Sequence, residues 1–261
     1  GADTLVTDIN YTMLENLTIQ WRDEQELKPA TIRKRIHVIS RVLRQCTKWT
    51  DPDTGLHYLT GCPAMPSIIV RNFKDHVVSI EEERAILEAI DARHQAERGS
   101  DWFIMRRLVI FLLDTGARLG ETRLMPFSEV KVNYVTFTGD TTKNYLDREV
   151  PLSDRASKVL QDIHDMFGGE TPFGSLHPAK IWRLFSKIKD DVGNLDGVTM
   201  HTFRHTTATR LLKGAGNQKM KLERVALWLG HQDISITTKR YAHLCVDDLH
   251  EGVGILKAVT G

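Results

Sequence analysis

Two histidines, an arginine and a tyrosine in the last quarter of the chain have side chains that could hold and break a phosphodiester. His201 and Arg204 lie three residues apart, so on a helix they would share one face, and His231 and Tyr241 follow downstream. An arginine fork matches two phosphate oxygens, an imidazole can hold or move a proton near neutral pH, and a phenolic oxygen can attack phosphorus. The pattern favours a site for phosphoryl transfer.

The same histidines have a rival interpretation as metal ligands. His201 and His205 are four residues apart, which is also the spacing of a zinc pair on a helix. Position 202 is threonine where the H-E-x-x-H motif has glutamate, and His231 is the one evident third ligand. Arg204 lies between the pair, and a cation is a poor neighbour for a metal. We therefore expect neither a metal nor a cofactor.

An arginine farther upstream could supply charge to this cluster. Gly116 and Gly120 lie on either side of Arg118, so the backbone there could turn tightly and a ligand could approach it closely. Glu121, three residues after Arg118, could orient the guanidinium group. The alternative is a surface arginine at a helix junction with an internal salt bridge, and this segment alone favours neither.

Lys143 and Tyr241 each have an ordinary structural interpretation. Lys143 lies in Thr141–Asn144, on a predicted strand or its turn. A lysine there is usually a solvated residue that keeps the edge of a sheet from pairing with other chains, although it could also donate a proton to a leaving oxygen. A helical tyrosine is usually a packing residue. Because the pKa of free tyrosine is near 10, its use as a nucleophile requires cations or a base nearby.

The elements that must position these residues are mostly helices. A capping box at Ser79–Glu82 predicts a helix through Ile90, and residues 102–115 predict a buried one. Apolar spacing changes to alternation over residues 130–152, which predicts two or three short strands. Further helices are expected to begin near Arg155, Pro178, Thr202, Lys221 and Ile236.

A smaller helical unit precedes this part, with a boundary near residue 75. Apolar spacing predicts one helix over about residues 7–22 and another from Pro29 to about Trp49, and residues 27–50 contain no acidic side chain. A solvated face is the ordinary interpretation of a basic helix, but the missing acids favour contact with DNA phosphates. The candidate DNA-binding residues are Arg33, Lys34, His37, Arg41, Arg44 and Lys48.

Composition limits the class of protein. The chain has 261 residues, of which 41% are hydrophobic and 26% charged, so it is expected to fold around a core. A formal charge of +1 neither requires nor excludes nucleic acid, because local patches count for more than the total. Three cysteines without a C-x-x-C pair, and no apolar run of membrane-spanning length, predict a cytoplasmic protein that does not associate with membranes.

Taken together, five segments resemble the tyrosine recombinases, also called the phage or lambda integrase family. They are Thr115–Glu121, Thr142-Lys143 with Arg148–Leu152, His201–Thr206, Leu229–His231 and Thr237–His243. The resemblance is strong over residues 77–245 and looser over 1–75. It implies a mainly α fold with a small antiparallel sheet, in which a helical core-binding domain (1–75) precedes an α+β catalytic domain (76–261) with a tail at 244–261.

The resemblance also implies a mechanism. Tyr241 would attack a DNA phosphate to form a 3′-phosphotyrosine, with release of a 5′-hydroxyl and without metal or ATP. Arg118 and Arg204 would clamp the phosphate. Lys143 would protonate the leaving oxygen, and His201 would assist proton transfer at the nucleophile. His231 would hydrogen-bond the phosphate, whereas His205 is expected only to support the structure.

The implied partners are duplex DNA with attachment or core sites and further copies of the chain. A homotetramer is expected in the synaptic complex and a monomer or dimer in isolation, with accessory DNA-bending proteins as further candidates. Two alternatives share the site or the fold: a topoisomerase IB-like or telomere-resolving strand transferase, and a DNA-binding accessory protein without activity.

Overall fold

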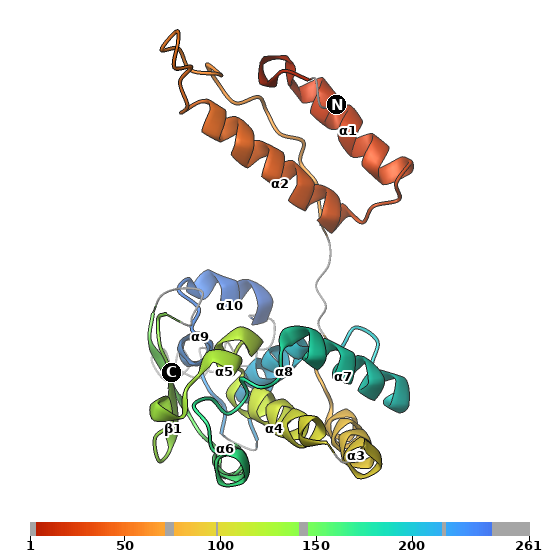
Figure 1. The fold of residues 1–261 in the computed structure, drawn as a ribbon, viewed down its shortest axis with the longest axis vertical. Coiled ribbons are helices and arrows are strands. Elements are labelled where there is room, and N and C mark those ends of the chain that lie inside the picture. Colours follow the sequence, from red (N-terminus) through yellow and green to blue (C-terminus); the bar gives the residue numbers. More distant parts are fainter. Residues whose placement is uncertain (1–3, 71–75, 98, 141–145, 216–217, 242–261) are drawn as a thin grey trace, which may run out of the picture. The chain divides into compact units, whose positions relative to one another are not determined.

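The computed structural model describes residues 4–70, 76–97, 99–140, 146–215 and 218–241, and the chain forms two compact units. The first unit comprises residues 1–73 and the second residues 74–261, where the sequence placed the boundary near residue 75. Figure 1 shows the elements of each unit.

The first unit contains two packed helices after a short 3₁₀ helix, η1 (Val6–Asp8). Helix α1 (Tyr11–Asp23) begins where the Asn10 side chain accepts a hydrogen bond from the Met13 backbone N–H at 3.1 Å. Helix α2 (Pro29–Cys46) has proline in its first turn, where the missing N–H is not needed. It ends three residues before the expected Trp49, and a β-bridge between Thr50 and His57 follows.

The second unit is built around α4 (Ser100–Thr115). Ten of its sixteen residues are buried, as expected of a helix that is apolar on nearly every side. Four helices pack against it, namely α3 (Ile80–Glu97), α6 (Asp154–Phe167), α7 (Pro178–Val192) and α8 (Met200–Lys213).

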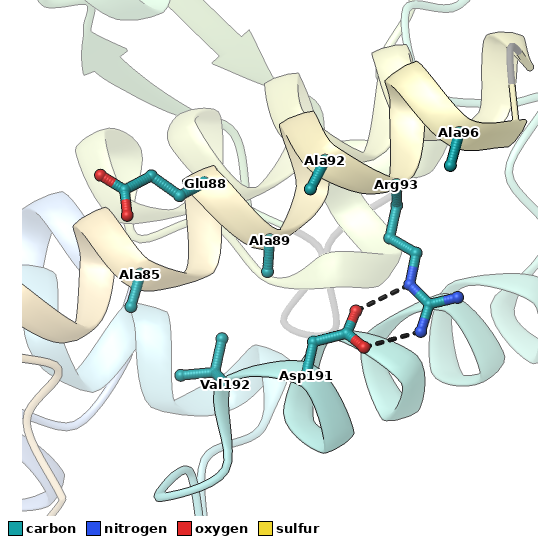
Figure 2. Close-up of a pocket in the computed structure, with 8 residues that line it drawn as sticks. All are labelled: Ala85, Glu88, Ala89, Ala92, Arg93, Ala96, Asp191 and Val192. Atoms are coloured by element: carbon teal, nitrogen blue, oxygen red, sulfur yellow. Dashed lines mark hydrogen bonds and ion pairs between the residues drawn. The ribbon is translucent and has the colours of Figure 1, made fainter.

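Helix α3 begins at the predicted capping box but extends seven residues beyond Ile90. The Ser79 backbone N–H donates to Glu82 Oε2 at 2.8 Å, and the Glu82 N–H donates to Ser79 Oγ at 3.1 Å. Figure 2 shows its later turns beside α7, where Arg93 forms a two-pronged ion pair with Asp191, at 2.7 Å for each contact. This ion pair is one reason that the helix continues to Glu97.

The predicted strands form one two-stranded antiparallel sheet, β1 (Tyr134–Phe137) and β2 (Arg148–Pro151). Val135 lies opposite Val150, and both are buried together with Phe137. The alternation of buried and exposed residues is therefore that of a sheet with one face on the core.

Short elements complete the second unit: α5 (Leu119–Leu124), η2 (Phe127–Glu129), α9 (Leu222–Leu229) and α10 (Ile234–Tyr241). Helix α9 contacts α8, α10 and β2. The predicted class, mainly α with a small antiparallel sheet, is confirmed for the described residues. Within them, no helix is long and apolar enough to cross a membrane.

Candidate active site

Arg204 holds together the two turns that carry Arg118 and His231. It lies in α8, and its side chain is buried, with the residue only 3% exposed. Its two terminal nitrogens donate to the carbonyl oxygens of Gly116, at 2.8 Å, and of Leu229. Each carbonyl lies two residues before another candidate, so Arg118 and His231 are placed by the same guanidinium group.

Arg118 is the residue immediately before α5, and Glu121 orients it as expected. Nη1 of Arg118 donates to Glu121 Oε1 at 2.6 Å, and the Arg118 backbone N–H donates to Oε2 at 3.2 Å. Glu121 is 2% exposed, whereas the Arg118 side chain keeps 25% of its surface exposed. Burial by itself raises the pKa of Glu121, but ion pairs with Arg148 and Arg118 outweigh it, and the pKa falls below its usual value.

Gly116 is required in the turn before Arg118, although for packing more than for ligand approach. It has a φ of +63°, and a Cβ there would lie 3.1 Å from Leu229 Cδ2 and 3.2 Å from Thr207 Cβ. The end of α4 can therefore approach α8 and α9 closely. A Cβ on Gly120 would meet open space, so the second glycine is not needed for the turn.

His231 is a neutral hydrogen-bonding group at pH 7. Burial first, and then the positive charges of Arg204 and Arg118, lower its pKa to about 4. Its Nδ1 lies 2.6 Å from Thr237 Oγ1, on a threonine that is fully buried. The side chain of Thr237 thereby fixes the orientation of the imidazole ring.

His201 and Arg204 differ in exposure despite their helical spacing. His201 lies in the first turn of α8 and is exposed, whereas all of the following residues to Thr209 are buried. Desolvation and the charges of Arg204, Arg240 and Arg118 lower the pKa of His201 below its usual value. The helix is thus enclosed on most sides, and its beginning presents His201 at the surface.

Tyr241 ends α10 and is covered in this conformation. It is 3% exposed and packs among Ala208, Leu212, Val225 and Leu229. Its hydroxyl lies 2.8 Å from His205 Nδ1, and the two rings are 5.1 Å apart.

The contact gives His205 a part that the sequence did not predict. His205 was expected only to support the structure, yet it is the histidine whose ring nitrogen meets the phenolic oxygen. The pair is separated by 36 positions, so spacing within one helix could not have indicated it.

The rival metal interpretation requires three converging ligands. No group of three histidine, cysteine or acidic side chains that could hold a metal ion occurs among the described residues. His205 directs Nδ1 at Tyr241 and His231 directs Nδ1 at Thr237, so these two nitrogens have other partners.

Two sets of predicted residues lie elsewhere. Lys143 is outside the described residues, as is the tail at 244–261. The six candidate DNA-binding residues belong to the first unit, five of them in α2 and Lys48 just after it, and all are exposed.

Arg148, at the start of β2, was not predicted as a site residue. Its Nη2 donates to Glu121 Oε2 at 2.7 Å, so that one carboxylate binds Arg118 and Arg148 together. Arg148 also lines a small cavity of about 130 Å³ with Arg118 and His231. Its partner is 27 residues away, and its sequence context is that of an ordinary strand.

The groove drawn in Figure 2 contains none of these residues. It lies along the alanine-rich face of α3, and its charged wall is the Arg93–Asp191 ion pair. The candidate site is therefore the cluster around Arg204.

Comparisons with known proteins show which family the chain belongs to. Residues 77–247 match the sequence model described as the phage integrase family. Tyrosine recombinase XerC of Erythrobacter litoralis is 28% identical over 258 residues, which cover 94% of this chain and 78% of that protein. The integrase of Escherichia phage P2 is 25% identical, covering 90% of this chain but 61% of its own length. The match to a putative integrase/recombinase of Haemophilus influenzae likewise covers only 59% of that protein's length.

Solved structures share the fold. A lambda integrase (75–356) dimer bound to a COC′ core site has a TM-score of 0.64 at 17% identity, covering 90% of this chain and 83% of that one. The Tn1549 transposon integrase in complex with circular intermediate DNA has a TM-score of 0.66 at 14% identity, covering 95% and 86%. Because the family model matches residues 77–247, which are more than half of the chain, this chain belongs to the phage integrase family of tyrosine recombinases.

Proposed function

We propose that this chain is a site-specific DNA recombinase of the integrase type, which cuts and rejoins strands through a 3′-phosphotyrosine at Tyr241. The observation that carries the proposal is the contact of Arg204 with the carbonyl oxygens of Gly116 and Leu229. It gathers two arginines and a neutral histidine from three separate segments. A phosphodiester is the ligand that such a set fits.

The arginines supply charge that is fixed before the substrate arrives. Burial and the neighbouring charges of Arg118 and Arg148 lower the pKa of Arg204 to about 9, so it stays protonated at neutral pH. Arg118 and Arg204 clamp the nonbridging oxygens and stabilise the charge of the transition state. His231, neutral and oriented by Thr237, donates one hydrogen bond to the same phosphate.

The reaction is a balanced exchange of one ester for another. The Tyr241 oxygen forms a bond to phosphorus and the bond from phosphorus to the 5′ oxygen breaks. The phenolic proton passes to a base, for which we propose His201, and Lys143 protonates the leaving oxygen. The 5′-hydroxyl of a partner strand reverses the step, and neither metal nor ATP enters the balance.

Tyr241 must leave its place among α8 and α9 before it can attack. The hydroxyl is covered and hydrogen-bonded to His205, so the described conformation is a resting state of the nucleophile. DNA or a second copy of the chain would have to favour the exposed state by binding it more tightly.

The first unit is proposed to contact the DNA backbone through the basic stripe of α2. We use this term for Arg33, Lys34, His37, Arg41 and Arg44, which lie on the side of α2 away from the buried Ile32, Ile36 and Leu43, and for Lys48, which lies two residues after the helix ends. Exposed cations of this kind neutralise phosphates and release counterions. They give affinity and carry no base sequence information directly.

Duplex DNA and a homotetramer in the synaptic complex are the proposed partners, with a monomer or dimer in isolation. The support is that one structural neighbour is a lambda integrase tetramer bound to a Holliday junction, with a TM-score of 0.62 and 18% identity over 87% of this chain and 66% of that one. Accessory DNA-bending proteins are further proposed partners, on the family resemblance alone.

Covalent trapping tests the proposal. The protein is mixed with nicked duplexes whose cleavage region is randomised, so that the short strand beyond the break dissociates with its 5′-hydroxyl. The adduct is measured as DNA that stays with the denatured protein, and the retained DNA is sequenced. Wild type and the control Tyr134→Phe should form it, and Tyr241→Phe should not.

The label position tests the polarity. A label at the 5′ end of the cut strand should remain with the protein, because the tyrosine takes the 3′ phosphate. An adduct from Tyr241→Phe, or none from wild type across the pool, would show that the mechanism is wrong.

A further inference from the structure

Arg148 has no part in the mechanism above, yet it lies within the charged cluster. Its side chain is 8% exposed, and its Nε–H is buried without a hydrogen-bond partner. Burying an arginine is costly unless its charge is paired, so its placement here requires an explanation.

Three contacts fix the Arg148 side chain. Its guanidinium carbon lies 4.5 Å from the centre of the Phe137 ring, and Nη2 is 2.7 Å from Glu121 Oε2. Gly230, at the end of α9, leaves room on the third side. A Cβ there would come within 2.8 Å of Arg148 Cδ, and the φ of Gly230 is +67°. Strand β1, helix α5 and the end of α9 therefore hold the Arg148 side chain in one rotamer.

The carboxylate of Glu121 is shared between two guanidinium groups. Oε1 accepts from Arg118 at 2.6 Å and Oε2 from Arg148 at 2.7 Å. With Arg118 alone, the buried pair would have no net charge. With both arginines the group keeps one positive charge, and Arg204 adds a second beside it.

We infer that Arg148 is a positioning residue for the proposed strand-transfer reaction. By taking one oxygen of Glu121, it allows this carboxylate to orient Arg118 without cancelling the charge that Arg118 brings to the phosphate. The inference rests on the proposed function of Arg118 as a phosphate clamp. Arg148 acts through Glu121 and through its field on the cavity that it lines with His231.

Electrostatics around the cavity agree with this role. The charge of Arg148 contributes to the lowered pKa of His231, after burial, Arg204 and Arg118. Loss of Arg148 should therefore raise the pKa of His231 and move the acid limb of the rate profile to higher pH.

The test uses single-turnover adduct formation on the DNA selected by covalent trapping. Arg148→Gln should slow cleavage by roughly ten- to a hundredfold, the scale of a misplaced reacting group. Arg148→Lys, which keeps the charge, should stay within about threefold of wild type on the same scale. Arg106→Gln is the matched control, because Arg106 pairs with Asp91 at the surface of the same unit.

A double variant separates charge balance from simple support of the structure. If Arg148 offsets Glu121, Arg148→Gln combined with Glu121→Gln should cleave no more slowly than Arg148→Gln alone, because the uncompensated carboxylate has been removed. Multiplication of the two single defects would overturn the inference, and so would an Arg148→Lys variant as slow as Arg148→Gln. Thermal unfolding shows whether each variant is folded.

The two proposals fail in different ways. If wild type forms no adduct, the proposed function is wrong. If wild type cleaves and Arg148→Gln cleaves equally fast with an unchanged pH profile, only the role of Arg148 is wrong. The affinity for DNA should be unchanged in both Arg148→Gln and Arg148→Lys, since Arg148 is almost fully buried.

Discussion

The basic stripe of α2 and the arginine cluster of the second unit use the same kinds of side chain in opposite ways. All six stripe residues are exposed, and no side-chain hydrogen bond or ion pair involves them within the described part of the chain. In the cluster, Arg204 is 3% exposed, and Arg118 and Arg148 share a carboxylate that is 2% exposed.

The difference separates affinity from chemistry. Mobile, solvated cations neutralise many phosphates and gain counterion entropy, with little dependence on the position of each one. Cations that are held by a buried carboxylate and by carbonyl oxygens cannot follow a moving phosphate. They are oriented before the substrate arrives, and this orientation is what stabilises a transition state.

The largest effect is expected for Arg204→Ala. The carbonyl oxygens of Gly116 and Leu229 would lose their buried donor, which should lower the free energy of unfolding by about 2–4 kcal/mol. Adduct formation should fall on the order of a hundredfold or more as well. Urea unfolding and covalent trapping measure the two effects. Arg41→Ala in the stripe should leave stability unchanged, and also adduct formation when DNA is saturating, and an equal stability loss there would remove the contrast.

Arg118→Ala should reduce catalysis with little loss of stability or affinity. The rate of adduct formation at saturating DNA should fall on the order of a hundredfold, because the variant lacks one half of the clamp. Its Kd for duplex DNA should stay within about twofold, since one phosphate contact among many is lost. A loss of binding that matches the loss of rate would instead make Arg118 a general electrostatic contact. Arg106→Ala is the charge-matched control.

The stripe should show the reverse pattern. Arg41→Gln combined with Arg44→Gln should weaken duplex binding and reduce the slope of log K against log salt by about 0.9 for each lost phosphate contact. The cleavage rate at saturating DNA should be close to that of wild type. Arg22→Gln removes the same kind of charge from α1, where it pairs with Asp23, and should leave the slope unchanged. An unchanged slope in the double variant would exclude the stripe from the interface.

A smaller effect is expected from pH. The pKa of His231 is about 4 in the folded protein and close to its usual 6.5 when unfolded. As the pH falls from 6.5 toward 4, His231 takes up a proton in the unfolded chain but stays neutral in the folded protein. The contribution of His231 to stability is thus fully present above pH 6.5, and it is lost as the pH falls from there through the pKa of the folded state.

His231→Gln should reduce this dependence, because glutamine does not titrate. The difference between the melting temperatures at pH 7 and pH 5 should shrink by about 2–4 °C for each kcal/mol that the titration of His231 contributes in a domain of this size. The stripe histidine, in His37→Gln, should leave this difference unchanged. Equal differences in wild type and His231→Gln would show that the ring titrates normally in the folded protein.

Local patterns in the sequence were sufficient for most of the fold. The Ser79–Glu82 capping box, Pro29 in the first turn of α2 and the alternation in both strands all depend on residues that lie near one another in the chain. Helix ends also depend on contacts with residues far away in the chain. Helix α3 continues past Ile90 partly because Arg93 meets Asp191, which lies 98 positions away.

The candidate site divides in the same manner. Sequence alone determined which residue types are present and that Glu121 could reach Arg118 within one helical turn, as it does at 2.6 Å. Only the tertiary structure decided that Arg204 joins two distant carbonyls, that His205 meets Tyr241 and that Arg148 shares Glu121. Periodicity gives the direction of a side chain relative to its own helix or strand. It does not say which other element lies opposite, because that depends on how the whole core packs.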